Sequence, residues 1–386
     1  MANLPGNRGS CWVAGAGPTG YSPLDGSIHA ETVVVGGGIV GLTTALRLRE
    51  AGRSVVLLEA LEIGGQVTGR STAKITTQHA LIYRHLIDAL DLARARRYAE
   101  ANSAGAALIK DWIREYAIAC DLERKDAYTY ATSGEGREAV VAEAEAARQV
   151  GLEARVLDRA PLPFETTGAL CFADQAQFNP AKYLVGLAHA VADHGGRIFE
   201  QSRAVLIGEA SRWRLVTAGG TVHAEHVVVA TNMTVKSPVG MASRTQPRCH
   251  TAMAFRIDDP LVVDGMFIGI DDPTHSDGFG RYGPAARRTR CEIRYRPGWE
   301  RRRSLRGVGR MGAAEPGRRG GRLALVQRGL RHCGPGALCW RTRSREGSGL
   351  SYRYRIQRLG HQQRDRGRHD DRRDDRRPRQ SLAEPL

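Results

Sequence analysis

The clearest pattern of apolar and polar positions lies in residues 31–60, which read ETVVVGGGIVGLTTALRLREAGRSVVLLEA. Residues 32–35 form a short β-branched run, which predicts a buried parallel strand. The apolar spacing that follows predicts an amphipathic helix to about residue 51, with Gly52 at a C-cap position. Residues 54–58 predict a second strand. The order of strand, helix and strand predicts a parallel βαβ unit.

The turn between the first strand and the helix contains glycines in the pattern GxGxxG. Gly36 suits the tight turn, Gly38 lets the backbone approach a pyrophosphate, and Gly41 lets helix and strand pack closely. The helix N-terminus favours phosphate through its free N–H groups and its dipole. Glu59 ends the second strand and can accept both hydroxyl hydrogens of an adenosine ribose. The combination predicts a dinucleotide site; the alternative is a glycine-rich turn in an unrelated α/β domain.

Residues 203–232 show a second regular pattern of apolar and polar positions. Short alternating strands around a turn at Gly219-Gly220 predict a β-meander, and its last apolar strand ends in Ala-Thr-Asn. A long insertion followed by such a strand resembles flavoproteins with two dinucleotide-binding-type halves, which favours FAD over NAD. Within the insertion, residues 86–118 and 135–149 predict charged, alanine-rich helices of a cap domain.

Taken together, these stretches resemble the D-amino-acid-oxidase-type FAD-dependent oxidoreductases. Residues 20–79 are similar to a bacterial branch of this family, many members of which carry a C-terminal Rieske domain. The resemblance covers roughly residues 20–276 and also rests on the stretches ERKDAYTYATS, FADQAQFNPAKYLVGLAHAVADHGGRIFE and DGMFIGIDDPTHS.

The resemblance implies an α/β fold of two parts. A two-dinucleotide-binding-domain-type FAD domain would use residues 28–80 and 172–240. An interleaved α+β substrate (cap) domain would use residues 81–171 and 241–276. Residues 1–27 are glycine- and proline-rich, and we expect an irregular lead-in there.

The resemblance also implies which residues contact FAD. They belong to the glycine turn, the end of the second strand, a small polar loop, the meander and the late strand. These residues are Gly36, Gly37, Gly38, Ile39, Val40, Gly41, Glu59, Ala60, Gly69, Arg70, Ser71, Thr72, Val205, Ala230 and Thr231. The alternatives are a surface cation for Arg70 and core packing for Val205. Lys74 and His79 are weaker candidates for catalytic residues, and a structural or solvated role is the alternative for each.

The implied reaction is hydride transfer to flavin N5 from a C–H beside an amine or a hydroxyl. We therefore expect a small-molecule amine or amino-acid-like substrate, and oxygen or an electron acceptor to reoxidise the flavin. The cysteines are scattered without metal-ligand spacing, so no metal site is expected, and Cys171 is interpreted as a buried small hydrophobe. The absence of a signal peptide or a long apolar run predicts a cytoplasmic protein without a membrane segment.

Charge is distributed very unevenly along the chain. Residues 281–386 hold 30 of the 57 basic residues, all of them Arg, and 10 of the 41 acidic residues. Their net charge is therefore +20, which leaves −4 for residues 1–280 out of the total of +16. Low hydrophobicity with high net charge is typical of a chain that cannot bury enough surface to fold. We expect residues 277–386 to be non-native or disordered.

A tail whose basic residues are all arginine is compatible with translation in a shifted reading frame. With permitted codons, residues 358–373 (RLGHQQRDRGRHDDRR) read one nucleotide later as GWGISNGTAAGMMIA. That string resembles the strand end, glycine turn and helix that close over the flavin in this family. The hypothesis is a frameshift after about residue 276, which would impair activity. The alternative is a basic disordered tail that binds nucleic acid; irregular spacing and the lack of interleaved aromatics in residues 306–323 disfavour it.

Overall fold

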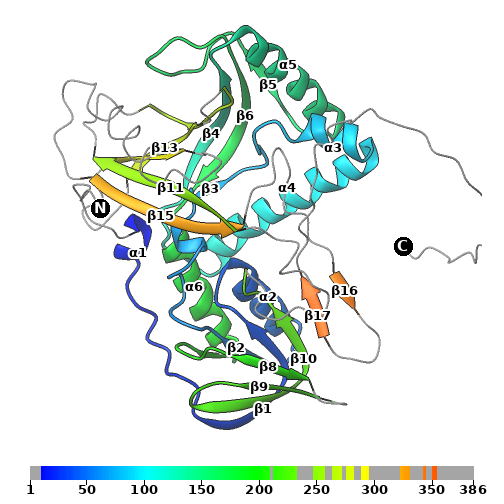
Figure 1. Ribbon diagram of the computed structural model, residues 1–386, viewed down its shortest axis with the longest axis vertical. Helices are drawn as coiled ribbons and strands as arrows, with labels where there is room; N and C mark the ends of the chain where they lie inside the picture. The colour runs from blue at the N-terminus through cyan, green and yellow to red at the C-terminus, as the bar shows by residue number, and fades with distance from the viewer. Residues whose placement is uncertain are drawn as a thin grey trace, which may run out of the picture.

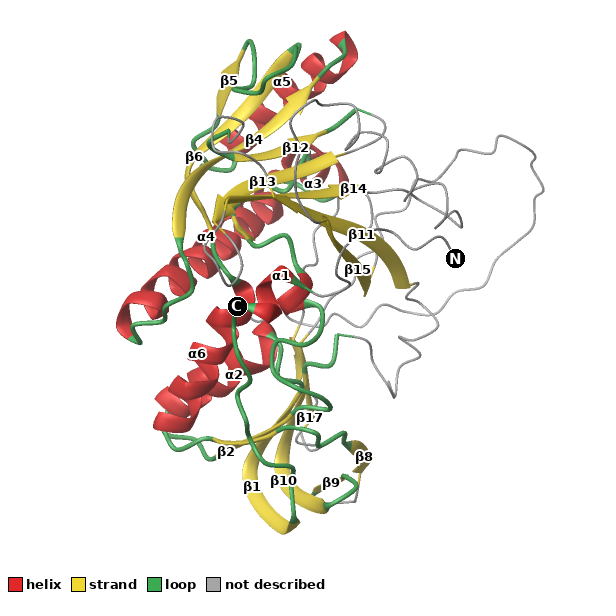
Figure 2. Cartoon of the chain, turned by 90° about the vertical axis from the view of Figure 1, so that its left-hand side faces the viewer, coloured by secondary structure: helices red, strands yellow, loops and turns green. Residues whose placement is uncertain are grey.

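The computed structural model describes residues 10–208, 212–232, 247–256, 263–271, 275–281, 288–294, 322–330, 342–344 and 350–353. Two sheets lie towards opposite ends of the molecule, with helices packed between and beside them (Figure 1). The second view shows α2 and α6 against the first sheet, and the other sheet in the opposite lobe (Figure 2). The expected α/β fold is confirmed.

The first sheet has a parallel centre and an antiparallel extension. β1 pairs in parallel with β2 and along its whole length with β10, and β2 pairs with β7. β8 and β9 extend β10 as the predicted meander. The strands are β1 (Gly26–Val35), β2 (Val55–Leu58), β7 (Arg197–Phe199), β8 (Val205–Gly208), β9 (Trp213–Val216) and β10 (Gly220–Val229).

The central strands are apolar at successive positions because both faces of the first sheet are covered. Val34 and Leu57 belong to the core cluster that includes residues of α2 and α6. Val33 and Val56 belong to a second cluster, with Leu215 from the meander. Alternate side chains of a strand point to opposite faces, so burial on both faces requires an uninterrupted apolar run.

Local side-chain caps determine where several helices begin. Asp91 accepts a hydrogen bond from Arg94 N at the start of α4, and Ser133 accepts one from Gly136 N at the start of α5. The predicted helices at 86–118 and 135–149 correspond to α3 with α4 and to α5. The described helices are α1 (Cys11–Ala14), α2 (Ile39–Glu50), η1 (Thr68–Arg70), α3 (Tyr83–Ala89), α4 (Leu92–Glu115), α5 (Gly134–Gln149) and α6 (Pro180–Asp193).

The second sheet includes strands from residues 81–171, where the cap is predicted, and the cap assignment stays a prediction. Its neighbouring strands are antiparallel except β4 and β12, which run parallel. Helices α3 and α5 cover one face, where Leu170 and Phe172 pack with Val140 and Leu86. The strands are β3 (Lys74–Ile75), β4 (Glu123–Ala131), β5 (Arg155–Leu157), β6 (Gly168–Gln177), β11 (Pro247–Arg256), β12 (Met266–Gly269), β13 (His275–Arg281), β14 (Arg288–Arg294) and β15 (Arg322–Leu330).

Backbone segments of the arginine-rich region join both sheets. β14 and β15 pair with β11, while β17 (Leu350–Arg353) pairs with β10 and with β16 (Thr342–Ser344). The expectation that residues 277–386 are non-native or disordered stays a prediction. A sheet edge pairs with a strand through backbone N–H and C=O groups, which any non-proline residue provides. The string at 358–373 lies outside the described residues.

The described part of the lead-in is packed against the first sheet and its helices, although residues 15–25 form no helix or strand. Trp12 is fully buried within α1. The buried Glu200 carboxylate accepts hydrogen bonds from Thr19 Oγ1 (2.5 Å), Tyr21 N (3.1 Å) and Ile63 N (2.6 Å). A glycine- and proline-rich composition disfavours helices and strands. These hydrogen bonds nevertheless hold the segment against the part of the chain that forms the first sheet. None of the helices in the described ranges offers a stretch long and apolar enough to cross a membrane.

Candidate cofactor site

The glycine turn lies where the carboxyl ends of three parallel strands meet the start of α2. Gly36 donates its N–H to Leu58 O (2.8 Å), and Ala230 donates its N–H to Val35 O (2.8 Å). Gly36 has φ 112°, in the region that favours glycine. A Cβ atom there would lie 2.5 Å from Ala230 O. The structure thus places the predicted late-strand residues Ala230 and Thr231 directly against the predicted turn.

Two further glycines lie so close to neighbouring atoms that no side chain would fit. A Cβ atom on Gly41 would lie 1.8 Å from Gly36 O, and one on Gly37 would lie 2.9 Å from Ile63 Cγ1. Gly38 is the N-cap of α2 and provides no side-chain hydrogen bond to it. The first turn of this helix, with Ile39 and Val40, therefore presents backbone at the position where a phosphate group would bind.

The Glu59 side chain contacts the turn directly. It is 8% exposed; Oε2 accepts a hydrogen bond from Gly37 N (2.6 Å), and Oε1 accepts one from Leu61 N (2.9 Å). Each carboxylate oxygen has a second lone pair, so these bonds leave capacity for a ribose hydroxyl. Ala60, the next predicted residue, is half-buried beside it.

The small polar loop at 69–72 lies beside the same helix end. Thr68 Oγ1, one residue before the loop, accepts a hydrogen bond from Ile39 N (3.3 Å). Gly69 is buried, Ser71 and Thr72 are half-buried, and the Arg70 side chain is exposed. Thr68 is a contact that the sequence analysis missed, because a single threonine carries no spacing signal.

Val205, a predicted cofactor contact, lies at an exposed position. Its side chain is 50% exposed at the start of β8, so the core-packing alternative is wrong. Ser202, three residues earlier, donates its N–H to Glu59 O (2.8 Å), which places the chain before β8 beside the end of β2. Contact between Val205 and the cofactor remains a prediction.

Lys74 and His79 both contact the cap. Lys74 Nζ donates a hydrogen bond to Phe267 O (3.0 Å) on β12. His79 Nδ1 lies 2.7 Å from Tyr98 Oη, and the two rings meet edge to face. These contacts support the structural alternative for His79. Lys74 lies two residues after the polar loop and joins it to the cap sheet.

The cysteine and metal expectations can be compared with the described residues alone. Burial raises the pKa of the Cys171 thiol, whose side chain is 1% exposed, as expected for a structural rather than a redox-active residue. Within the described part of the chain, no group of His, Cys, Asp or Glu is arranged to hold a metal ion.

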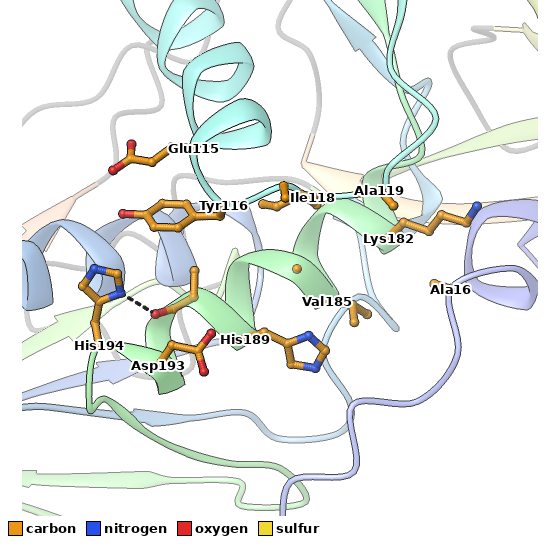
Figure 3. Close-up of a pocket in the computed structure, with 13 residues that line it drawn as sticks. Ala16, Glu115, Tyr116, Ile118, Ala119, Lys182, Val185, His189, Asp193 and His194 are labelled. Carbon is orange, nitrogen blue, oxygen red and sulfur yellow. Dashed lines mark hydrogen bonds between the residues drawn. The ribbon is translucent and has the colours of Figure 1, made fainter.

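A separate pocket of about 690 Å³ lies between α6 and the C-terminal end of α4 (Figure 3). Tyr116, Lys182, His189 and Asp193 are among the residues that line it. None of the predicted FAD residues does so. The pocket is therefore separate from the predicted FAD site.

The fold and the glycine turn together define a dinucleotide-binding α/β protein with an interleaved cap sheet. Residues 31–302 match the model of the DAO family, described as FAD dependent oxidoreductase, and the chain belongs to this family. Family membership implies FAD as the cofactor. The match extends beyond residue 276, where the sequence resemblance was expected to end.

Two curated relatives have similar sequences. The chain is 30% identical over 267 residues to YhfW of Bacillus subtilis (strain 168), named as a candidate Rieske 2Fe-2S iron–sulfur protein; this covers 68% of the chain and 52% of the relative. It is also 30% identical over 242 residues to gamma-glutamylputrescine oxidoreductase of Escherichia coli (strain K12). This second match covers 60% of the chain and 56% of the relative. The chain thus spans about half the length of these relatives.

Among solved structures, L-proline dehydrogenase from P. horikoshii has a similar fold. The TM-score is 0.62 at 18% identity, and the likeness covers 86% of this chain and 88% of that one. This likeness shows a shared fold, and the family match identifies the protein as an FAD-dependent oxidoreductase.

Proposed function

We propose that this chain oxidises a small amine or amino-acid-like molecule by hydride transfer from a substrate C–H to flavin N5. The observation that carries this proposal is the close contact of the glycine turn with Ala230. A Cβ atom at Gly36 or Gly41 would overlap backbone oxygen, so the turn has the close approach that a dinucleotide pyrophosphate requires.

The residues present fit FAD. The turn from Gly36 to Gly41 and the start of α2 would hold the pyrophosphate, and Glu59 would accept the ribose hydroxyls. The loop at 69–72 and the pair Ala230-Thr231 would flank the cofactor. Bound FAD supplies the hydride acceptor, while the protein supplies orientation and the electrostatic environment.

The substrate class follows from the relatives. Gamma-glutamylputrescine oxidoreductase and L-proline dehydrogenase are named for an amine and an amino acid. We extend this class to the present chain, with oxygen or an electron-acceptor protein reoxidising the flavin. We assign no nucleic acid or membrane partner to this function, and we place the reaction in the cytoplasm.

The test of the site is an FAD titration of the full chain, with Glu59→Gln as the variant. The amide provides one acceptor oxygen in place of two charged ones, so either Gly37 N or Leu61 N loses its partner. We expect the dissociation constant, measured by flavin fluorescence, to rise roughly tenfold, about 1.4 kcal/mol.

Glu62→Gln is the matched control for this titration. Glu62 is an exposed acid three residues away, and its substitution should leave the FAD affinity unchanged. Equal dissociation constants for the two variants would contradict the role of Glu59. Failure of the unaltered chain to bind FAD would contradict the site as a whole.

We also propose that a change of reading frame produced the arginine-rich region and impairs the activity of this chain. Support comes from the switch to arginine without lysine, and from permitted codons for residues 358–373 that would encode a flavin-closing string in the neighbouring frame. Since the family match in the present frame runs to residue 302, the codons for residues 270–310 are the ones to sequence. A neighbouring frame interrupted by stop codons would exclude this origin, and salt-dependent DNA binding by residues 281–386 would then be the next measurement.

A further inference from the structure

The lead-in contacts the polar loop through the Ser10 hydroxyl. Ser10 Oγ donates a hydrogen bond to Gly69 O (2.6 Å) and accepts one from Trp12 N (3.2 Å). Ser10 is 7% exposed, so the carbonyl of Gly69 depends on this hydroxyl rather than on bulk water. The same hydroxyl therefore caps α1 and holds the first residue of the loop.

The Trp12 side chain makes a second contact with the same loop. Trp12 Nε1 donates a hydrogen bond to Ser71 O (3.1 Å), two residues after Gly69. The indole is fully buried, and α1 packs against both η1 and α6. Burial of an indole gives a strongly favourable apolar contribution, and its N–H then requires a partner. The loop backbone provides that partner.

The far end of the loop is also held in a restricted conformation. Ala73 has φ 62°, in the left-handed region, which costs an alanine roughly 1–2 kcal/mol. Its N–H donates to Ser71 Oγ (3.2 Å), and its carbonyl accepts from Phe178 N (3.1 Å). Such a conformation persists where the surroundings impose it. The loop is thus fixed by groups from the lead-in, from itself and from the chain entering α6.

We propose that Ser10 and Trp12 are positioning residues for FAD: they hold the backbone of residues 69–71 in its cofactor-binding conformation before FAD binds. This inference rests on the proposed function, since it takes the loop as part of the FAD site. Thr68, next to the loop, is bonded to Ile39 N at the start of α2, so a displaced loop would disturb the proposed phosphate site. Ordering a loop before binding removes an entropic cost from association.

The test uses the full chain and two variants, Ser10→Ala and Trp12→Phe. Each removes one donor to the loop and keeps most of the packing. One readout is the FAD dissociation constant from flavin fluorescence, together with the absorption spectrum of the bound flavin. We expect an increase of roughly fivefold for each variant, the value for one lost hydrogen bond.

A second readout works without FAD. Arg70 is exposed, and trypsin cleaves after it, so the rate of cleavage at this bond reports how firmly the loop is held. We expect both variants to be cleaved several times faster there. Ser10→Thr retains a hydroxyl and should restore slow cleavage and the original affinity.

Trp112→Phe is the matched control. Trp112 is an equally buried indole, 2% exposed, on α4. Its substitution should lower the thermal stability without changing the FAD affinity or the cleavage at Arg70. This separates loop positioning from a general loss of packing.

The outcomes distinguish the two proposals. If the unaltered chain binds FAD, but Ser10→Ala and Trp12→Phe match it in affinity and spectrum, the inference is overturned and the proposed function stands. Faster cleavage with unchanged affinity overturns it as well, because the anchored loop would then not serve the cofactor. If the unaltered chain does not bind FAD, both proposals fail.

Discussion

Gly41→Ala is expected to abolish detectable FAD binding and to destabilise the first domain by about 3 kcal/mol or more. A Cβ atom at this position would lie 1.8 Å from Gly36 O, 3.0 Å from Gly36 C and 3.4 Å from Val34 Cγ1. The first two atoms belong to the backbone of the turn, so they cannot rotate away. Helix α2 would have to move off β1, and the proposed phosphate site at its N-terminus would move with it.

Gly105→Ala provides the control for this prediction. Gly105 also lies within a helix, α4, and a Cβ atom there meets nothing within 4 Å. This substitution should raise the free energy of unfolding by about 0.5–1 kcal/mol, the ordinary helix-propensity effect, and leave FAD affinity unchanged. Thermal unfolding and FAD titration of both variants measure the difference. Equal behaviour of the two would contradict the assignment of Gly41 to the contact between helix and strand.

The second large effect is expected at Glu143, a carboxyl group buried between α5 and the start of α3. Burial raises its pKa from 4.5 to about 7, although hydrogen bonds from Tyr83 N (2.7 Å) and Arg84 N (2.9 Å) favour the charged form. Because the folded-state pKa lies above the unfolded value, the folded protein binds an additional proton between these two pH values. Its stability should therefore fall as the pH rises from about 4.5 to 7, by up to roughly 3 kcal/mol.

Glu143→Gln removes this titration and retains an acceptor oxygen for the start of α3. The variant should lose the decrease in stability between pH 4.5 and 7, so that its stability relative to the unaltered protein rises with pH. Urea unfolding at several pH values measures this difference. Glu138→Gln, an exposed acid on the same helix, should reproduce the pH dependence of the unaltered protein. A parallel pH dependence in the Glu143 and Glu138 variants would rule out the buried carboxyl group as the cause.

The turn between β1 and α2 could be predicted from the sequence because its constraints are local. Gly36, Gly38 and Gly41 lie within six residues, and the strand and helix that they join have regular apolar spacing. The meander was predictable for the same reason, because the alternation of apolar and polar residues and the Gly-Gly turn both lie within a few neighbouring residues. The proximity of Ala230 to this turn followed only from the family resemblance, because strand order is not encoded in local periodicity.

The contacts of the lead-in could not be predicted in this way. Ser10 and Gly69 are 59 positions apart, and Ser10 belongs to a segment whose composition predicts no regular element. One tryptophan and one serine form no repeat, so their burial depends on a surface that exists only after α6 and η1 have packed. The core-packing alternative for Val205 arose for a related reason: a β-branched residue at a strand start resembles a core position until the sheet edge is known.

The pairing of β1 with β10 has a consequence for the order in which the protein forms during synthesis. β1 ends at Val35, but its partner strand is completed only at Val229, so the first sheet stays open until that strand has left the ribosome. Among the described residues, the buried members of the cluster that packs α3 and α5 against the second sheet lie between Ile82 and Phe172. The cap core is therefore available to fold first, and a nascent chain shorter than about 220 residues would carry the glycine turn without the strand that completes it.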